Sequence, residues 1–102
     1  MPFKDRNKQR AAQAKYQRTK VQKLRAEFIA LKEADPCLDC GVSYPYYVME
    51  YDHVRGEKKE RLNRLVARGA RKAAYEELEK CELVCANCHR VRTQERMTNI
   101  AS

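Results

Sequence analysis

Two pairs of cysteines constrain this chain more than any other feature of its sequence. Cys37 and Cys40 form one CxxC pair, and Cys85 and Cys88 form a second pair after an interval of 44 residues. Two thiolates at this spacing can hold one side of a tetrahedral zinc ion, and a second pair completes the four-sulfur shell. One structural zinc ion is therefore expected to fasten the start of a domain to its end, with the intervening residues looped out.

Other uses of the cysteines compete with zinc. The pairs could act as redox centres or carry free thiols. The CANCH run at residues 85–89 also matches the CxxCH pattern of covalent haem attachment. Haem attachment leaves Cys37 and Cys40 unexplained and in most settings requires export, for which we see no signal. Zinc accounts for all four cysteines and is the preferred interpretation.

Three neighbouring residues support the metal-binding turns or lie close to them. Gly41 follows the first pair, where a tight cysteine turn often needs a small residue or one with positive φ. Asn87 is the candidate for the same role in the second turn, because asparagine tolerates the left-handed region. Cys81 is left over, and we expect it to be a small buried hydrophobe.

Composition points to a small soluble domain with a polyanionic partner. The 102 residues carry a formal net charge of +8, and 35% of them are charged. Residues 1–33 hold ten lysines and arginines against three acidic residues, so nearly all of the excess lies there. A basic segment of this kind favours nucleic acid as partner, with a merely soluble helix as the alternative. No signal peptide or membrane span is recognised, so a cytoplasmic location without membrane binding is expected.

The basic segment has the pattern of a long amphipathic helix. From about Arg10, apolar residues recur at spacings of three and four, and Asp35-Pro36 ends the pattern because the residue before proline disfavours helix. The narrow apolar seam is expected to pack on the domain or on a second copy rather than on a membrane. It consists of Val21, Leu24, Phe28 and Leu31.

The rest of the chain predicts an α+β domain. Residues 46–53 alternate and are rich in β-formers, which predicts a strand with Met49 and Tyr51 on one face and Glu50 on the other. Short helices are expected at 60–68, before Gly69, and at 71–80. A brief strand at 82–85 and a basic helix at 86–97 complete the prediction.

The two histidines are free for other chemistry if the cysteines hold zinc. His53 follows Asp52 at the end of the predicted strand, and His89 follows a zinc ligand. A carboxylate and a ring nitrogen can hold a divalent ion weakly, while a second imidazole takes a proton from water. Alternatively, Asp52 caps a turn and both histidines pack against tyrosines. Adjacent strand residues point to opposite faces, so Asp52 and His53 can share a site only if the strand ends or bulges there.

Three segments together resemble a known family. CLDC, YDHVRGEKK and EELEKCELVCANCHRVRT, in this order, resemble the small zinc-containing HNH endonucleases of bacteriophages and bacteria over residues 37–96. The resemblance implies a ββα-metal core stapled by the four-cysteine zinc site, with a helical insertion. It also implies that His53 is the general base and that Asp52 and His89 bind one catalytic divalent ion. Mg²⁺ or Mn²⁺ is expected, with Ni²⁺ or Zn²⁺ as alternatives.

One position departs from the family pattern. Many relatives have an asparagine nine residues before the last histidine, where it orients the loop that carries the base. This chain has Lys80 there. Asn87 or Asn63 are the candidates for the same task, and relatives with a KCxLLCxNCH run exist.

The resemblance assigns roles to the basic residues and divides the chain into a DNA-binding arm, residues 1–34, and a nuclease domain, residues 35–102. Phosphate contacts of this kind favour weakly specific binding. Only one of Arg90 and Arg92 is expected to meet DNA, because the two cannot share a helical face. The candidates are Lys15, Arg18, Lys23, Arg25, Lys58, Lys59, Arg90, Arg92 and Arg96.

The predicted activity is hydrolysis of DNA phosphodiester bonds, by nicking or by double-strand cleavage, in a monomer or weak homodimer. If the gene belongs to a phage, the location is the bacterial host cell. One alternative is a catalytically inactive, zinc-stapled DNA-binding module. Another is a nuclease that acts only together with phage packaging proteins.

Overall fold

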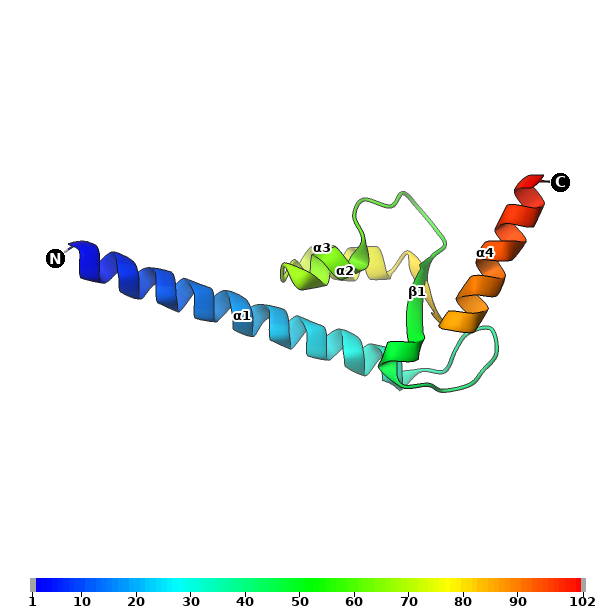
Figure 1. The fold of residues 1–102 in the computed structure, drawn as a ribbon, viewed down its shortest axis with the longest axis horizontal. Coiled ribbons are helices and arrows are strands. Elements are labelled where there is room, and N and C mark those ends of the chain that lie inside the picture. Colours follow the sequence, from blue (N-terminus) through cyan, green and yellow to red (C-terminus); the bar gives the residue numbers. More distant parts are fainter. Residues whose placement is uncertain (1, 102) are drawn as a thin grey trace.

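Over the residues that the structure describes, the chain forms an α+β structure in which a two-stranded sheet is embedded among four helices, as the sequence predicts. The computed structural model describes residues 2–101, and side chains over residues 8–99. The elements, in order, are helix α1 (Pro2–Ala34), a 3₁₀ turn η1 (Tyr46–Val48), strand β1 (Met49–His53), helices α2 (Leu62–Ala67) and α3 (Arg71–Leu78), strand β2 (Cys81–Cys85) and helix α4 (Ala86–Ala101). The start of α1 and the end of α4 lie at opposite ends of the molecule (Figure 1).

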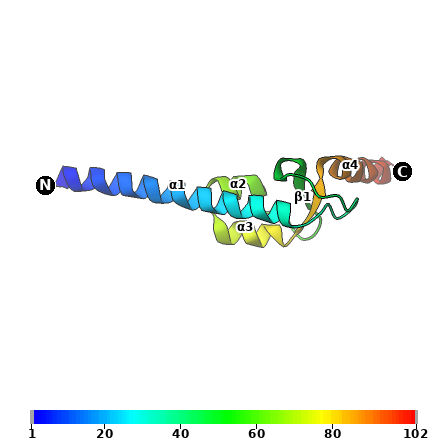
Figure 2. The same cartoon turned by 90° about the horizontal axis from the view of Figure 1, so that it is seen from below.

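Helix α1 is a single rod that extends far beyond the rest of the protein. It begins at Pro2, earlier than the apolar periodicity indicates, because lysine, arginine, glutamine and alanine are strong helix formers even without an apolar face. It ends at Ala34, two residues before Pro36, as predicted. All side chains of residues 8–20 are exposed. Figure 2 shows the first turns of α1 projecting beyond the other elements, while Gln17 Nε2 already donates to the Arg68 carbonyl just after α2.

The second half of α1 packs on α2 and α3. Leu24 and Phe28 are buried in a cluster with Leu65, Val66 and Ala74, which we call the helical cluster. The Phe28 ring also lies 5.3 Å from the Tyr75 ring, centroid to centroid. The apolar seam of α1 is therefore covered by the chain itself.

The sheet is shorter than predicted. Residues 46–48 form a turn in place of the first part of the strand, because Pro45 starts a turn that the Val48 N–H closes on the Pro45 carbonyl at 3.0 Å. Strand β1 pairs antiparallel with β2, with Met49 opposite Cys85 and His53 opposite Cys81. The two strands thus bring the segment after the first cysteine pair beside the second pair.

Helix α4 follows β2 directly and packs on one face of the sheet. Met49 and Val84 are buried with Cys37 and Cys85 in a second cluster, which we call the cysteine cluster. After His53 the chain leaves the sheet, and Gly56 adopts a φ of +70° that other residues rarely take. No described helix combines the length and the apolar character that a membrane span requires.

Candidate functional site

The four paired cysteines come together at the end of the sheet where Met49 pairs with Cys85. The sulfur atoms of Cys37, Cys40, Cys85 and Cys88 all lie within 4.8 Å of one another, and this is the one group of three or more such ligands among the side chains that the structure describes. Gly41 has a φ of +74°, so the predicted left-handed residue after the first pair is confirmed. Asn87 lies inside α4, and the prediction of a left-handed Asn87 is wrong, because the second pair closes on the first helical turn instead.

Backbone N–H groups point at these sulfur atoms. The Cys85 N–H donates to Cys37 Sγ at 3.3 Å, and the Cys88 N–H donates to Cys85 Sγ at 3.5 Å. Burial opposes ionisation of Cys37, but the N–H donors outweigh it and lower the pKa of this thiol to about 6. The adjacent Cys85 sulfur and burial raise the pKa of Cys88 to about 12. Close thiolates repel one another unless a cation lies between them, so this cluster is suited to hold a metal ion.

Asp52, His53 and His89 line one open cavity of about 600 Å³. Strand β1 is regular and ends at His53, so Asp52 and His53 have opposite orientations along it. The cavity nevertheless includes both residues in its lining. Four cations also line it, namely Lys32, Lys58, Arg61 and Arg96. Four carboxylates line it as well, so the sequence-predicted trio is brought together in a cavity of mixed charge.

His89 is held in an orientation typical of a metal ligand. Its Nδ1 lies 2.6 Å from Glu50 Oε1, and its Nε2 lies 3.4 Å from Asp52 Oδ1. A proton on Nδ1 that is donated to Glu50 leaves the Nε2 lone pair directed to the Asp52 side. A separation of 3.4 Å suits two ligand atoms that each lie about 2.1 Å from one ion. Glu50 was not among the site residues predicted from the sequence, because its contact with His89 depends on how α4 packs against β1.

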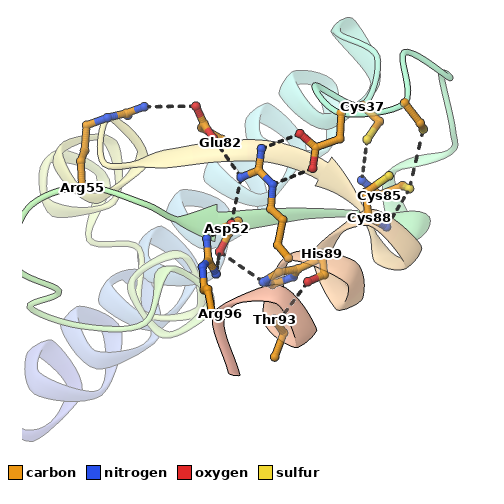
Figure 3. Close-up of polar contacts among 12 residues, drawn as sticks. Cys37, Asp52, Arg55, Glu82, Cys85, Cys88, His89, Thr93 and Arg96 are labelled. Carbon is orange, nitrogen blue, oxygen red and sulfur yellow. Dashed lines mark hydrogen bonds and ion pairs between the residues drawn. The ribbon is translucent and has the colours of Figure 1, made fainter. Parts of the chain in front are cut away.

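Asp52 is the most tightly held acid of the cavity. It is 3% exposed, and Figure 3 shows it between His89 and Arg96. Arg96 donates to both of its oxygens, at 2.9 and 2.6 Å, and Arg92 donates to Oδ2 at 2.9 Å. These bonds, with that of Arg96 the strongest, hold the pKa of Asp52 down to about 2 in spite of burial. Because Asp52 lies within a strand and accepts from arginines, the alternative in which it caps a turn is wrong.

The residues predicted to contact DNA differ in their exposure and in the hydrogen bonds that they already make within the protein. Arg92 donates to Asp39 and Glu82 as well as to Asp52, and these contacts consume its guanidinium within the protein. Arg96 is half exposed, and Lys58 is exposed, and both line the cavity. The remaining candidates lie exposed on α1, on the loop after β1 and on α4, and they are Lys15, Arg18, Lys23, Arg25, Lys59 and Arg90.

Lys80 lies in the turn between α3 and β2, where it fastens the loop that follows His53. Its Nζ donates to the Glu57 carbonyl at 2.8 Å and to Glu77 Oε1 at 2.7 Å. Its own carbonyl accepts from the N–H groups of Val54 and Arg55 at 2.9 and 3.2 Å. A lysine at the position of the expected asparagine therefore still contacts the loop beyond His53. The two alternative asparagines differ: Asn63 lines the cavity and Asn87 does not.

His53 and Glu77 line the same cavity as His89. Among the described side chains, His53 Nε2 and Glu77 Oε2 are the two buried polar atoms without a hydrogen-bond partner. Cys81, expected to be a buried hydrophobe, is only half-buried, lines the same cavity and donates to the Glu77 carbonyl at 3.3 Å. No signal in the sequence distinguished Glu77 from the other acids of α3.

Comparisons with protein families, with curated proteins and with solved structures found no match to this chain. The resemblance to HNH endonucleases thus depends on the three motif segments and stays a prediction. What can be stated of the molecule itself is an α+β fold, a four-cysteine cluster suited to a metal ion, and a charged cavity lined by two histidines together with equal numbers of cations and carboxylates.

Proposed function

We propose that this protein is a metal-dependent DNA endonuclease of the HNH type, which hydrolyses phosphodiester bonds in the cavity between β1, α4 and the loop after His53. One observation carries the proposal. Asp52, His53 and His89, the residues that the motif resemblance nominates, line the same cavity although His89 is far from the other two in sequence. Acid, imidazole and cation in one open cavity are the groups that phosphodiester hydrolysis requires.

Two different metal ions belong to this proposal. Zinc is assigned to the four cysteines, because a closed shell of four thiolates is typical of structural zinc. A second divalent ion, Mg²⁺ or Mn²⁺, is assigned to Asp52 Oδ1 and His89 Nε2, whose 3.4 Å separation and Glu50 support fit such a ligand pair. When bound, this ion would supply Lewis-acid stabilisation for the negative charge that develops on the phosphate.

The protein's own groups have separable tasks in this reaction. His53 takes the proton from the attacking water as general base. Arg96 is half exposed, so it can move from Asp52 to a phosphate oxygen when Asp52 binds the metal ion. Lys58 and Arg61 line the same cavity and would hold the flanking phosphates.

The exposed part of α1, residues 8–20, which we call its free half, is assigned to DNA binding. Its exposed side chains include Lys15 and Arg18 and present no buried apolar face. Contacts of lysine and arginine with phosphates give affinity without base recognition, so weakly specific binding is expected. The rival functions use the same surface. A DNA-binding module without activity, or a nuclease that needs packaging proteins, would bind plasmid DNA but leave it uncut when pure.

Conversion of supercoiled plasmid to nicked and linear forms tests the proposal. Wild-type protein is assayed with Mg²⁺, with Mn²⁺ and with EDTA, beside His53→Ala and the control Tyr47→Ala, which truncates an exposed side chain of the neighbouring turn. We expect cleavage that requires added metal, that falls at least about 100-fold in His53→Ala and that is unchanged in the control. Equal cleavage by His53→Ala and wild type, with equal zinc content, would contradict the assigned base.

A further inference from the structure

The two unpaired buried atoms, His53 Nε2 and Glu77 Oε2, are complementary in chemistry. A neutral imidazole can donate through Nε2–H, and a carboxylate oxygen can only accept. Buried polar atoms in native proteins nearly always have partners, so each unpaired atom asks for an explanation. Here one potential donor and one acceptor line the same cavity.

The fold brings these two side chains to the same place. His53 is the cross-strand partner of Cys81, so the two side chains share one face of the sheet. Cys81 Sγ in turn donates to the Glu77 carbonyl at 3.3 Å, which ties the last turn of α3 to this face. No hydrogen bond joins His53 to Glu77 in this conformation, and a rotation of one side chain is needed to make it.

Lys80 fixes the Glu77 carboxylate in its buried position. Glu77 is 3% exposed, and its Oε1 accepts from Lys80 Nζ at 2.7 Å. This bond lowers the pKa of Glu77 although burial opposes the shift, and the backbone N–H of Lys59 acts on the carboxylate in the same direction as Lys80. Lys80 also donates to the Glu57 carbonyl, so the same residue secures the loop and the carboxylate.

We propose that Glu77, held by Lys80, is a positioning residue for His53: its Oε2 accepts the Nε2–H hydrogen bond, so that Nδ1 keeps the lone pair that takes the proton from water. This inference deepens the proposed function and depends on His53 as its base. A carboxylate that fixes one tautomer and one ring orientation of a histidine is an arrangement that many active sites use. In this chain the carboxylate comes from α3 and the cation beside it is Lys80.

The tautomer of His53 tests this inference without any measurement of cleavage. The chain has two histidines, so a long-range ¹H–¹⁵N spectrum of the zinc-loaded protein contains two imidazole patterns, which His89→Gln assigns. In the pattern of the neutral ring we expect His53 to carry its proton on Nε2. In Glu77→Gln and in Lys80→Met we expect a mixture of tautomers. The matched controls Glu76→Gln and Lys72→Met, at exposed positions of α3, are expected to keep the wild-type pattern.

Cleavage rates give the second readout. We expect Glu77→Gln to lower the single-turnover rate by about 10- to 100-fold, as loss of an outer partner does at comparable sites, with zinc content and DNA affinity unchanged. A proton on Nδ1 in wild type, or an unchanged His53 pattern in both Glu77→Gln and Lys80→Met, would overturn the inference. If the wild type does not cleave DNA with any metal ion, the proposed function fails, while the tautomer still decides whether Glu77 and His53 are paired.

Discussion

The two halves of this molecule are held together by different means. The helical cluster is formed by side chains such as Leu24, Phe28 and Leu65, which bury apolar surface between α1, α2 and α3. The cysteine cluster contains only four buried residues, and two of them are Cys37 and Cys85. The first region is an ordinary apolar core on a small scale, whereas the second is too small to be stable by burial alone.

The cavity lies where these two regions meet. Asp52 and His89 belong to the region of the cysteine cluster, while Lys32, Leu62 and Glu77 reach it from the helical region. Its geometry therefore requires both regions to be folded at the same time. The difference teaches that a metal ion at the cysteines would act on the proposed reaction indirectly, since it would hold α4, and hence His89, against the sheet.

Removal of a metal ion from the four cysteines should have the largest effect on stability, and this effect should be concentrated in the cysteine region. We expect a strong chelator, or Cys85→Ser, to unfold the sheet and release α4, because structural zinc binding contributes on the order of 10 kcal/mol to folding. The helical content of α1 should persist in part. Near-ultraviolet circular dichroism and the dispersion of amide NMR signals measure the loss. An unchanged melting temperature of the fully chelated protein would show that the cysteine region does not need its metal ion.

Truncation of the helical cluster should have the next largest effect. We expect Leu24→Ala to lower the free energy of unfolding by about 3 kcal/mol, because the side chain is 1% exposed and leaves a cavity. The control Tyr16→Ala, at a 69% exposed position of the same helix, should change it by less than about 0.5 kcal/mol. Urea unfolding of the zinc-loaded proteins gives both values. Equal effects of the two substitutions would mean that α1 does not pack on α2 and α3 in solution.

Charge removal from the free half of α1 should alter DNA binding and leave stability unchanged. We expect the double variant Lys15→Gln, Arg18→Gln to bind duplex DNA several-fold more weakly. The slope of log affinity against log salt should become shallower by about 0.9 for each DNA phosphate that the variant no longer neutralises. Fluorescence anisotropy at several salt concentrations measures the slope, and Gln13→Ala is the uncharged control. An unchanged slope would remove α1 from the DNA interface.

The pH dependence of stability that arises from the contacts of Glu27 in α1 with α3 should be the smallest effect. Hydrogen bonds from Arg71 and then Tyr75 lower the pKa of Glu27, although burial opposes this. A lowered pKa means that Glu27 contributes stability above its unfolded-state value near 4.5, and that this contribution is lost as the pH falls through the lower folded-state value. We therefore expect Glu27→Gln to have a lower melting temperature than wild type at pH 7. The difference should shrink toward about pH 3, and a constant difference over this range would contradict the charge pairing.

The sequence predicted the parts of this structure that depend on local patterns. Short-range chemistry accounts for the clustering of the two CxxC pairs, for the helix end before Pro36 and for the positive φ of Gly41. The apolar seam of α1 packs on the domain, which was one of the two interpretations of its pattern. The strand was predicted too long because the turn after Pro45 competes with β-propensity over three residues. Glu50, Glu77 and the paired state of Arg92 could not be found, because they depend on which strand faces which helix.

The central claim is that two different metal sites divide the work, one holding the fold and one serving the reaction. The direct test is single-turnover cleavage of a duplex by protein with one zinc ion already bound, as Mn²⁺ is added in steps, for wild type and Asp52→Asn. We predict no cleavage with zinc alone, saturable activation by Mn²⁺ in wild type, and little activation in Asp52→Asn at unchanged zinc content. Full activity without added Mn²⁺, or equal activation of both proteins, would contradict the claim.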